Sequence, residues 1–186
     1  MPGLNLNFLK SLEADYSSFH YFVETGTFRA VTISTMEPYF NKLFTIEVAE
    51  PLWKAAKTKY QKKSKINFIL GDSSKEIPKL IKNELDKPTI FFLDGHYSAG
   101  VTGYAEKHVP LYEELTSIIN DFKSEAIIII DDIRIFGKLD SGICDWRDIN
   151  IESCLDIIKE RMSKHYFRPS CLDKNDRLVV HINSSA

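Results

Sequence analysis

Residues 126–132 read AIIIIDD, five apolar residues followed by two aspartates. A continuous apolar run of this length is typical of a strand that is buried on both faces of a parallel sheet. Four earlier runs have similar length and character, namely HYFVE at 20–24, LFTIE at 43–47, INFIL at 66–70 and TIFFL at 89–93. The sequence therefore predicts five parallel strands, one for each run.

The segments between these runs have helical patterns. Residues 50–63 place Pro51 at the start of a predicted helix, followed by apolar side chains that share one face. Apolar stripes over residues 111–122 and 151–162 predict two more helices, and Asn150 is a suitable N-cap for the second. Strands that alternate with helices indicate parallel strands joined by helical crossovers.

The C-terminal part predicts a different arrangement. Residues 166–171 and 178–182 have the pattern of a hairpin, and 136–148 is expected to be a long irregular connection. Over residues 1–186 we therefore expect a single α/β domain. Its fold class would be a doubly wound, Rossmann-like, mostly parallel seven-stranded sheet that ends in an antiparallel hairpin.

Composition excludes several classes of protein. Lys and Arg number 24 and Asp and Glu number 26, so the basic excess of a nucleic-acid binder is absent. No run of 18 apolar residues predicts a membrane span, and the first twenty residues lack the order of a signal peptide. The cysteines Cys144, Cys154 and Cys171 are scattered, as in a protein with reduced thiols. We expect a cytoplasmic protein without nucleic-acid or membrane partners.

The residues that follow each apolar run are the candidate site residues, since ligands of open parallel sheets bind at the carboxyl ends of the strands. An acid stands at or just after the end of every predicted parallel strand. These acids are Glu24, Glu47, Asp72, Asp94, Asp131 and Asp132.

The first three strand ends have the spacing of a nucleoside site. Gly26 lets the backbone turn close to a ligand, and Glu47 follows about 20 residues later, where a carboxylate can accept hydrogen bonds from ribose hydroxyls. Asp72, with Ser73 beside it, could accept a hydrogen bond from an adenine amine. The alternatives are that Gly26 only makes a tight turn, that Glu47 is a solvated strand-end charge, and that Asp72 caps a helix.

The later strand ends form a second group. Asp94, Asp131 and Asp132 should meet at one edge of the sheet, where their mutual repulsion calls for a cation. Oxygen ligands favour Mg²⁺, Mn²⁺ or Ca²⁺. The alternative is a surface loop in which Arg134 and Lys107 neutralise the acids.

Two further features stay open. His96, two residues after Asp94, could be a general base for a substrate hydroxyl, and residues 97–106 form either a lid or an ordinary connection. Trp146 and Arg147 face the substrate or pack the last helix.

Five segments together resemble the class I S-adenosylmethionine-dependent methyltransferases: FVETGTF at 22–28, TIEVAE at 45–50, ILGDSS at 69–74, FFLDGHYS at 91–98 and IIIIDDIRIF at 127–136. The last two look most like the metal-dependent, macrocin-type sugar O-methyltransferases. Thr27 stands where a second glycine is usual in that family.

The resemblance implies S-adenosylmethionine as cofactor and Mg²⁺, or another oxygen-preferring divalent ion, as metal. It implies Asp94, Asp131 and Asp132 as metal ligands and His96 with Asp94 as catalytic residues. The implied cofactor-binding residues are Glu24, Thr25, Gly26, Thr27, Glu47, Asp72, Ser73 and Asp94.

The expected function is therefore methyl transfer to a hydroxyl of a sugar or other small-molecule acceptor. A homo-oligomer is compatible with this expectation. One alternative is a catalytically silent binding or scaffold protein with the same fold. Another is a metal-dependent phosphoesterase, against which the lack of a P-loop counts.

Overall fold

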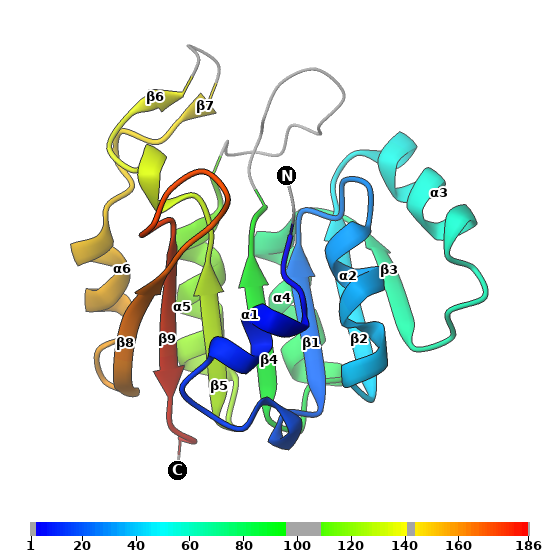
Figure 1. Cartoon of the computed structure of the whole chain (residues 1–186), viewed down its shortest axis with the longest axis horizontal. Coiled ribbons are helices and arrows are strands. Elements are labelled where there is room, and N and C mark those ends of the chain that lie inside the picture. Colours follow the sequence, from blue (N-terminus) through cyan, green and yellow to red (C-terminus); the bar gives the residue numbers. More distant parts are fainter. Residues whose placement is uncertain (1–2, 96–108, 141–143, 186) are drawn as a thin grey trace.

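The computed structural model describes residues 3–95, 109–140 and 144–185, and it shows a seven-stranded sheet with helices on both faces (Figure 1). The strand order is β3-β2-β1-β4-β5-β9-β8, and β9 runs antiparallel to the other six strands. This confirms the predicted fold class. The strands are β1 (Tyr21–Thr25), β2 (Lys42–Glu47), β3 (Ile66–Leu70), β4 (Thr89–Leu93), β5 (Ala126–Ile130), β8 (Met162–Arg168) and β9 (Arg177–Ile182).

The helices form two layers, with α1 to α3 on one face of the sheet and α4 to α6 on the other (Figure 1). Within the described ranges, none of them is long and apolar enough to cross a membrane. The α-helices are α1 (Leu6–Ser11), α2 (Val31–Met36), α3 (Glu50–Lys59), α4 (Ser73–Asn83), α5 (Leu111–Asp121) and α6 (Ile151–Ile158), and short 3₁₀ helices are η1 (Tyr16–Ser18), η2 (Glu37–Tyr39) and η3 (Ile133–Ile135).

The two-layer arrangement explains why the strands read as continuous apolar runs. Successive side chains of a strand point to opposite faces. In β5, Ile128 and Ile130 pack against the α4–α6 layer, while Ile127 and Ile129 pack against the α1–α3 layer. Both faces of β5 are therefore covered, and no polar residue fits within it.

Several predicted boundaries were wrong. The last helix ends at Ile158, and Met162, which shares the apolar spacing of that helix, begins β8 instead. β8 pairs with β9 from Met162 opposite Ile182 to Arg168 opposite Arg177. The first strand of the hairpin therefore begins at residue 162 and not at the predicted residue 166. The expected irregular connection holds two short paired strands, β6 (Leu139–Asp140) and β7 (Cys144–Asp145).

Backbone in the left-handed region gathers at the carboxyl edge of the parallel strands. After β1 it includes Gly26 (φ 81°), Phe28 (φ 44°) and Ala30 (φ 56°), and after β5 it includes Asp132 (φ 65°). Such conformations are costly for residues other than glycine and tend to occur at functional sites. The edge at which ligands are expected is therefore also where the chain is locally strained.

The fold predicts a contrast between two leucines near the C-terminal hairpin. Leu178 in β9 is fully buried, whereas Leu172 in the preceding connection is 54% exposed. We expect Leu178→Ala to lower the free energy of unfolding by about 2–5 kcal/mol because it leaves a cavity. Leu172→Ala should change it by less than about 0.5 kcal/mol. Urea denaturation measures both, and equal losses would contradict the assigned core.

Candidate functional site

Glu47 ties the end of β2 to the turn that follows β1. Its Oε2 accepts a hydrogen bond from the backbone N–H of Phe28 (2.9 Å), and its Oε1 accepts one from the N–H of Ala49 (2.9 Å). The side chain is 5% exposed at the carboxyl edge. Because each carboxylate oxygen has a second lone pair, the bonds that orient Glu47 leave it able to accept further hydrogen bonds.

Glu24 lies beneath this turn, in the interior. The hydroxyl of Thr45 donates to Glu24 Oε2 (3.0 Å) and is 2.6 Å from the hydroxyl of Thr27. Burial raises the pKa of Glu24 to about 8, and the nearby charge of Glu47 adds to the effect. Glu24 is therefore mostly protonated at neutral pH and supports the turn from below.

Asp72 caps α4, which was the alternative that the sequence left open. Its Oδ1 accepts hydrogen bonds from the backbone N–H of Ser74 (3.0 Å) and from the Ser74 hydroxyl (2.7 Å). Ser73 beside it is buried. A capping carboxylate at the start of α4 is fixed in place next to the end of β3.

The ends of β1 and β4 are in close contact. A Cβ on Gly26 would lie 2.5 Å from the carbonyl oxygen of Asp94, and a Cβ on Gly95 would lie 2.8 Å from the hydroxyl of Thr25. The N–H of Asp94 donates to that hydroxyl (3.2 Å). Only glycine fits at these two positions, so the contact brings Asp94 beside the β1 turn.

Asp94 itself is half-buried among other acids. Burial raises its pKa well above the usual range, and the charges of Asp131 and Asp132 raise it further. His96 and residues 97–106 lie outside the described residues, so the proposed base and lid stay predictions.

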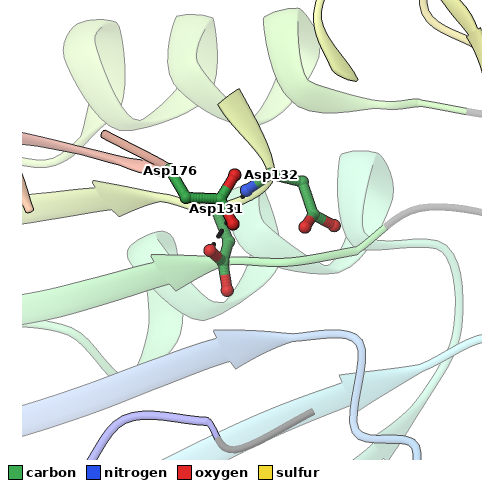
Figure 2. Close-up of side chains that lie close together, drawn as sticks. All are labelled: Asp131, Asp132 and Asp176. Atoms are coloured by element: carbon green, nitrogen blue, oxygen red, sulfur yellow. Dashed lines mark hydrogen bonds between the residues drawn. The ribbon is translucent and has the colours of Figure 1, made fainter. Parts of the chain in front are cut away.

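An acidic cluster, Asp131, Asp132 and Asp176, stands beside Asp94. Oxygen atoms of these three carboxylates lie within 4.8 Å of one another (Figure 2). The set differs from the predicted one, since it takes in Asp176 in place of Asp94. Asp176 immediately precedes β9, and pairing of Ile130 with Leu178 brings it to the end of β5. Asp176 lies between the two strands of the predicted hairpin, but the register of that hairpin with β5 was not visible in the sequence.

Two arginines partly neutralise the cluster. Arg177 Nε donates to Asp131 Oδ1 (3.1 Å), and its guanidinium also lies over the ring of Phe8 in α1. Arg134 Nη1 donates to Asp176 Oδ2 (2.8 Å) and contacts Asp132. The role of Arg134 was foreseen as an alternative, whereas Arg177 was missed. Lys107 lies outside the described residues.

The charges leave room for a cation. Asp94 and the acidic cluster supply four carboxyl groups, against the two guanidinium groups of Arg134 and Arg177. Counted over the described residues and with all four carboxyls ionised, the excess of two negative charges equals the charge of one divalent ion, and an all-oxygen donor set suits Mg²⁺. Burial also raises the pKa of Asp131, and Arg177 opposes that rise. The residues present therefore fit the predicted metal.

Trp146 and Arg147, for which the sequence left two roles open, lie in different surroundings. Trp146 is buried, stacks on Phe136 with ring centroids 5.4 Å apart, and lines a pocket together with Asp94 and Asp131. Arg147 has an exposed side chain that pairs with Asp145 (2.7 Å).

Protonation of Glu24 predicts a pH-dependent stability difference. Unfolded Glu24 loses its proton near pH 4.5, but the folded protein keeps it to about pH 8. Stability therefore falls as pH rises through this window, because the unfolded state binds fewer protons. We expect Glu24→Gln to gain stability over the wild type between pH 5 and pH 8, by up to a few kcal/mol.

Urea denaturation at pH 5, 6, 7 and 8 measures this difference. Glu50→Gln is the matched control, since the Glu50 side chain is 57% exposed. A difference between Glu24→Gln and wild type that stays constant with pH would contradict the buried, protonated state.

The pair between Arg177 and Asp131 predicts a second stability effect. Arg177→Met leaves a buried carboxylate without its cation, which should cost about 3–5 kcal/mol in the free energy of unfolding. Adding Asp131→Asn should restore part of the loss. Arg147→Met, which breaks an exposed pair, should cost less than about 1 kcal/mol. Denaturation of all three variants tests this, and equal costs for the two arginines would disprove it.

Comparison with known proteins adds a fold relationship. No protein-family model matches the sequence, and no curated protein matches it. An O-methyltransferase from Bacillus cereus in complex with SAH has a TM-score of 0.65 at 13% identity, over 90% of this chain and 76% of that one. TomG from Streptomyces achromogenes, an O-methyltransferase involved in tomaymycin synthesis and in complex with SAM, gives 0.61 at 12% identity, over 91% and 75%.

An rRNA methylase from Streptococcus thermophilus also matches, with a TM-score of 0.56 at 12% identity over 92% of this chain and 93% of that one. These identities are low, so the likeness concerns the fold. It agrees with the strand order, in which the antiparallel β9 lies between β5 and β8. The chain has the fold of the class I S-adenosylmethionine-dependent methyltransferases.

Proposed function

We propose that the protein is an S-adenosylmethionine-dependent methyltransferase that methylates a hydroxyl of a small molecule, assisted by a divalent cation. The observation that carries this proposal is the position of Glu47. It stands at the end of β2, is held by backbone N–H groups of Phe28 and Ala49, and adjoins the Gly26 turn. A carboxylate in this place can accept hydrogen bonds from the hydroxyls of a ribose.

Exposed apolar side chains near Glu47 support a nucleoside ligand. Phe28, which donates its backbone N–H to Glu47, is 43% exposed. Leu70 is 41% exposed and lies opposite Glu47 in the pairing of β2 with β3. Large exposed apolar side chains beside a buried acid suit a ligand that combines a flat base with a polar sugar. Asp72 and Ser73 at the start of α4 are the proposed neighbours of the base. Bound S-adenosylmethionine supplies the methyl group on its sulfonium.

The acidic cluster supports the metal-assisted part of the proposal. Asp131, Asp132 and Asp176 would hold the ion, with Asp94 next to them. The chemistry that a divalent ion would supply there is a lower pKa of the acceptor hydroxyl. Arg177 and Arg134 keep the carboxylates oriented toward one edge. His96 is proposed to take the proton from the acceptor hydroxyl, and the sheet edge would align the two reactants.

Calorimetric titration with S-adenosylhomocysteine tests the cofactor site. We expect binding by the wild type, and Glu47→Gln should weaken it about tenfold or more through loss of a charged hydrogen-bond acceptor. The control is Glu50→Gln, which changes an exposed glutamate three residues after Glu47. It should bind S-adenosylhomocysteine like the wild type. Lack of any binding by the wild type at millimolar ligand would end the proposal.

The Asp131→Asn/Asp132→Asn variant tests the metal. It should bind S-adenosylhomocysteine within about twofold of wild type while Mg²⁺-dependent methyl transfer is lost. Equal turnover by this variant with and without Mg²⁺ would contradict metal assistance and leave the cofactor site standing.

A further inference from the structure

A small pocket opens at the carboxyl edge between the ends of β4 and β5 and the start of α5. It holds about 230 Å³ of space, part of it open to solvent. The enclosed part of this space has room for about one water-sized group. It suits one end group of a larger molecule. Apolar side chains and Trp146 form most of the described lining, together with three acids: Asp94, Glu114 and Asp131.

Glu114 distinguishes this pocket from ordinary packing. It lies in the first turn of α5, is 1% exposed, and its Oε1 has no hydrogen-bond partner among the described residues. Gly95 leaves the approach to that oxygen open, because a Cβ at Gly95 would stand 3.4 Å from it. A buried carboxyl oxygen without a donor is costly, so a donor from outside the chain would be bound favourably.

Among the described residues, the charged side chains around the pocket favour a cation. No Lys, Arg or His is among the described residues that line it. Arg177, which lies behind Asp131, is engaged by that carboxylate. Each of the three lining acids that is ionised adds a negative potential to the space between them. Burial also raises the pKa of Glu114 to about 7, so a bound cation would favour its ionised form.

The apolar walls select the kind of cation. Mg²⁺ gives up its water shell reluctantly and is held among oxygen ligands, which the acidic cluster offers. Besides Asp94 and Asp131, the pocket lining combines Glu114 with the apolar side chains of Leu93, Val109 and Leu111. An organic ammonium group has N–H donors for the acid and carbon atoms for the apolar wall. That combination matches the lining better than a hydrated metal ion does.

We propose that this pocket binds the ammonium group of the methyl acceptor, with Glu114 as its anchor, so that the acceptor is an amine-bearing small molecule. The proposal rests on the methyltransferase function proposed above and narrows its acceptor class. Asp131 belongs both to the pocket and to the acidic cluster. An acceptor held by its ammonium group would therefore place a nearby hydroxyl at the cluster, as an amino alcohol or amino sugar can.

Nuclear magnetic resonance of the indole N–H groups offers a direct test, since the protein has two tryptophans. Trp146 lines the pocket, while the indole N–H of Trp53 in α3 donates to the carbonyl of Phe68. Titration with ethylammonium chloride should give a saturable shift of the Trp146 signal and leave the Trp53 signal unchanged. Ethanol and sodium chloride at equal concentrations should give no saturable shift.

Two neighbouring glutamates provide matched variants. Glu114→Gln keeps the shape but removes the charge, and it should weaken ethylammonium binding at least about tenfold, as expected for a charge-assisted hydrogen bond. Glu113→Gln, on the partly exposed side of α5, should bind like the wild type. If Glu114→Gln does not fold, Glu114→Asp serves instead, because it withdraws the carboxylate by one methylene and should also weaken binding.

Absence of a saturable ethylammonium shift, or equal binding by wild type and the Glu114 variant, would overturn the inference. A second overturning result concerns the cofactor. If Glu114→Gln weakens S-adenosylhomocysteine but not methylthioadenosine, which lacks the amino-acid part, the pocket serves the cofactor and not an acceptor. If the wild type does not bind S-adenosylhomocysteine but does bind ethylammonium, the methyltransferase proposal is refuted and the ammonium site stands. The two outcomes can be told apart because the ammonium titration needs no cofactor.

Discussion

The contact between the ends of β1 and β4 is the constraint on which the rest of the site depends. Gly26 passes against the carbonyl of Asp94, and Gly95 against the side chain of Thr25, at distances that leave no room for a Cβ. This contact fixes the β1 turn, which Glu47 then holds from β2. It also fixes the end of β4 beside the acidic cluster. Both groups of acids thus occupy one rigid edge, and a shift at either glycine would separate them.

Burial divides the acids of this edge into two electrostatic kinds. Burial raises the pKa of the Glu24 and Glu114 carboxyls, and no arginine or lysine of the described residues opposes that rise. Asp131 and Asp176 instead have arginine partners that favour their charged forms. A protonated acid such as Glu24 can serve as a hydrogen-bonding support, whereas paired acids keep a charge available to a cation. One sheet edge can therefore combine a supporting framework with a charged site.

Sequence reasoning predicted what depends on local pattern. The five parallel strands were visible because helices cover both faces, so AIIII at 126–130 could hold no polar residue. The strand-end acids were visible because they directly follow such runs. Asp176, Arg177 and Glu114 were not found, because their positions depend on the β5–β9 register and on the rotation of α5. Met162 satisfied a helical and a strand pattern equally, and only pairing with β9 decided between them.

The antiparallel direction of β9 has a consequence for how the chain acquires its site. Because β9 runs opposite to its neighbours, its first residues meet the last residues of β5, and Arg177 reaches Asp131. Synthesis from the N-terminus therefore produces the acids of β4 and β5 well before their arginine counter-charge. Until β9 inserts between β5 and β8, Asp131 has to stay hydrated or protonated, so the sheet can close over this edge only in the final stage of folding.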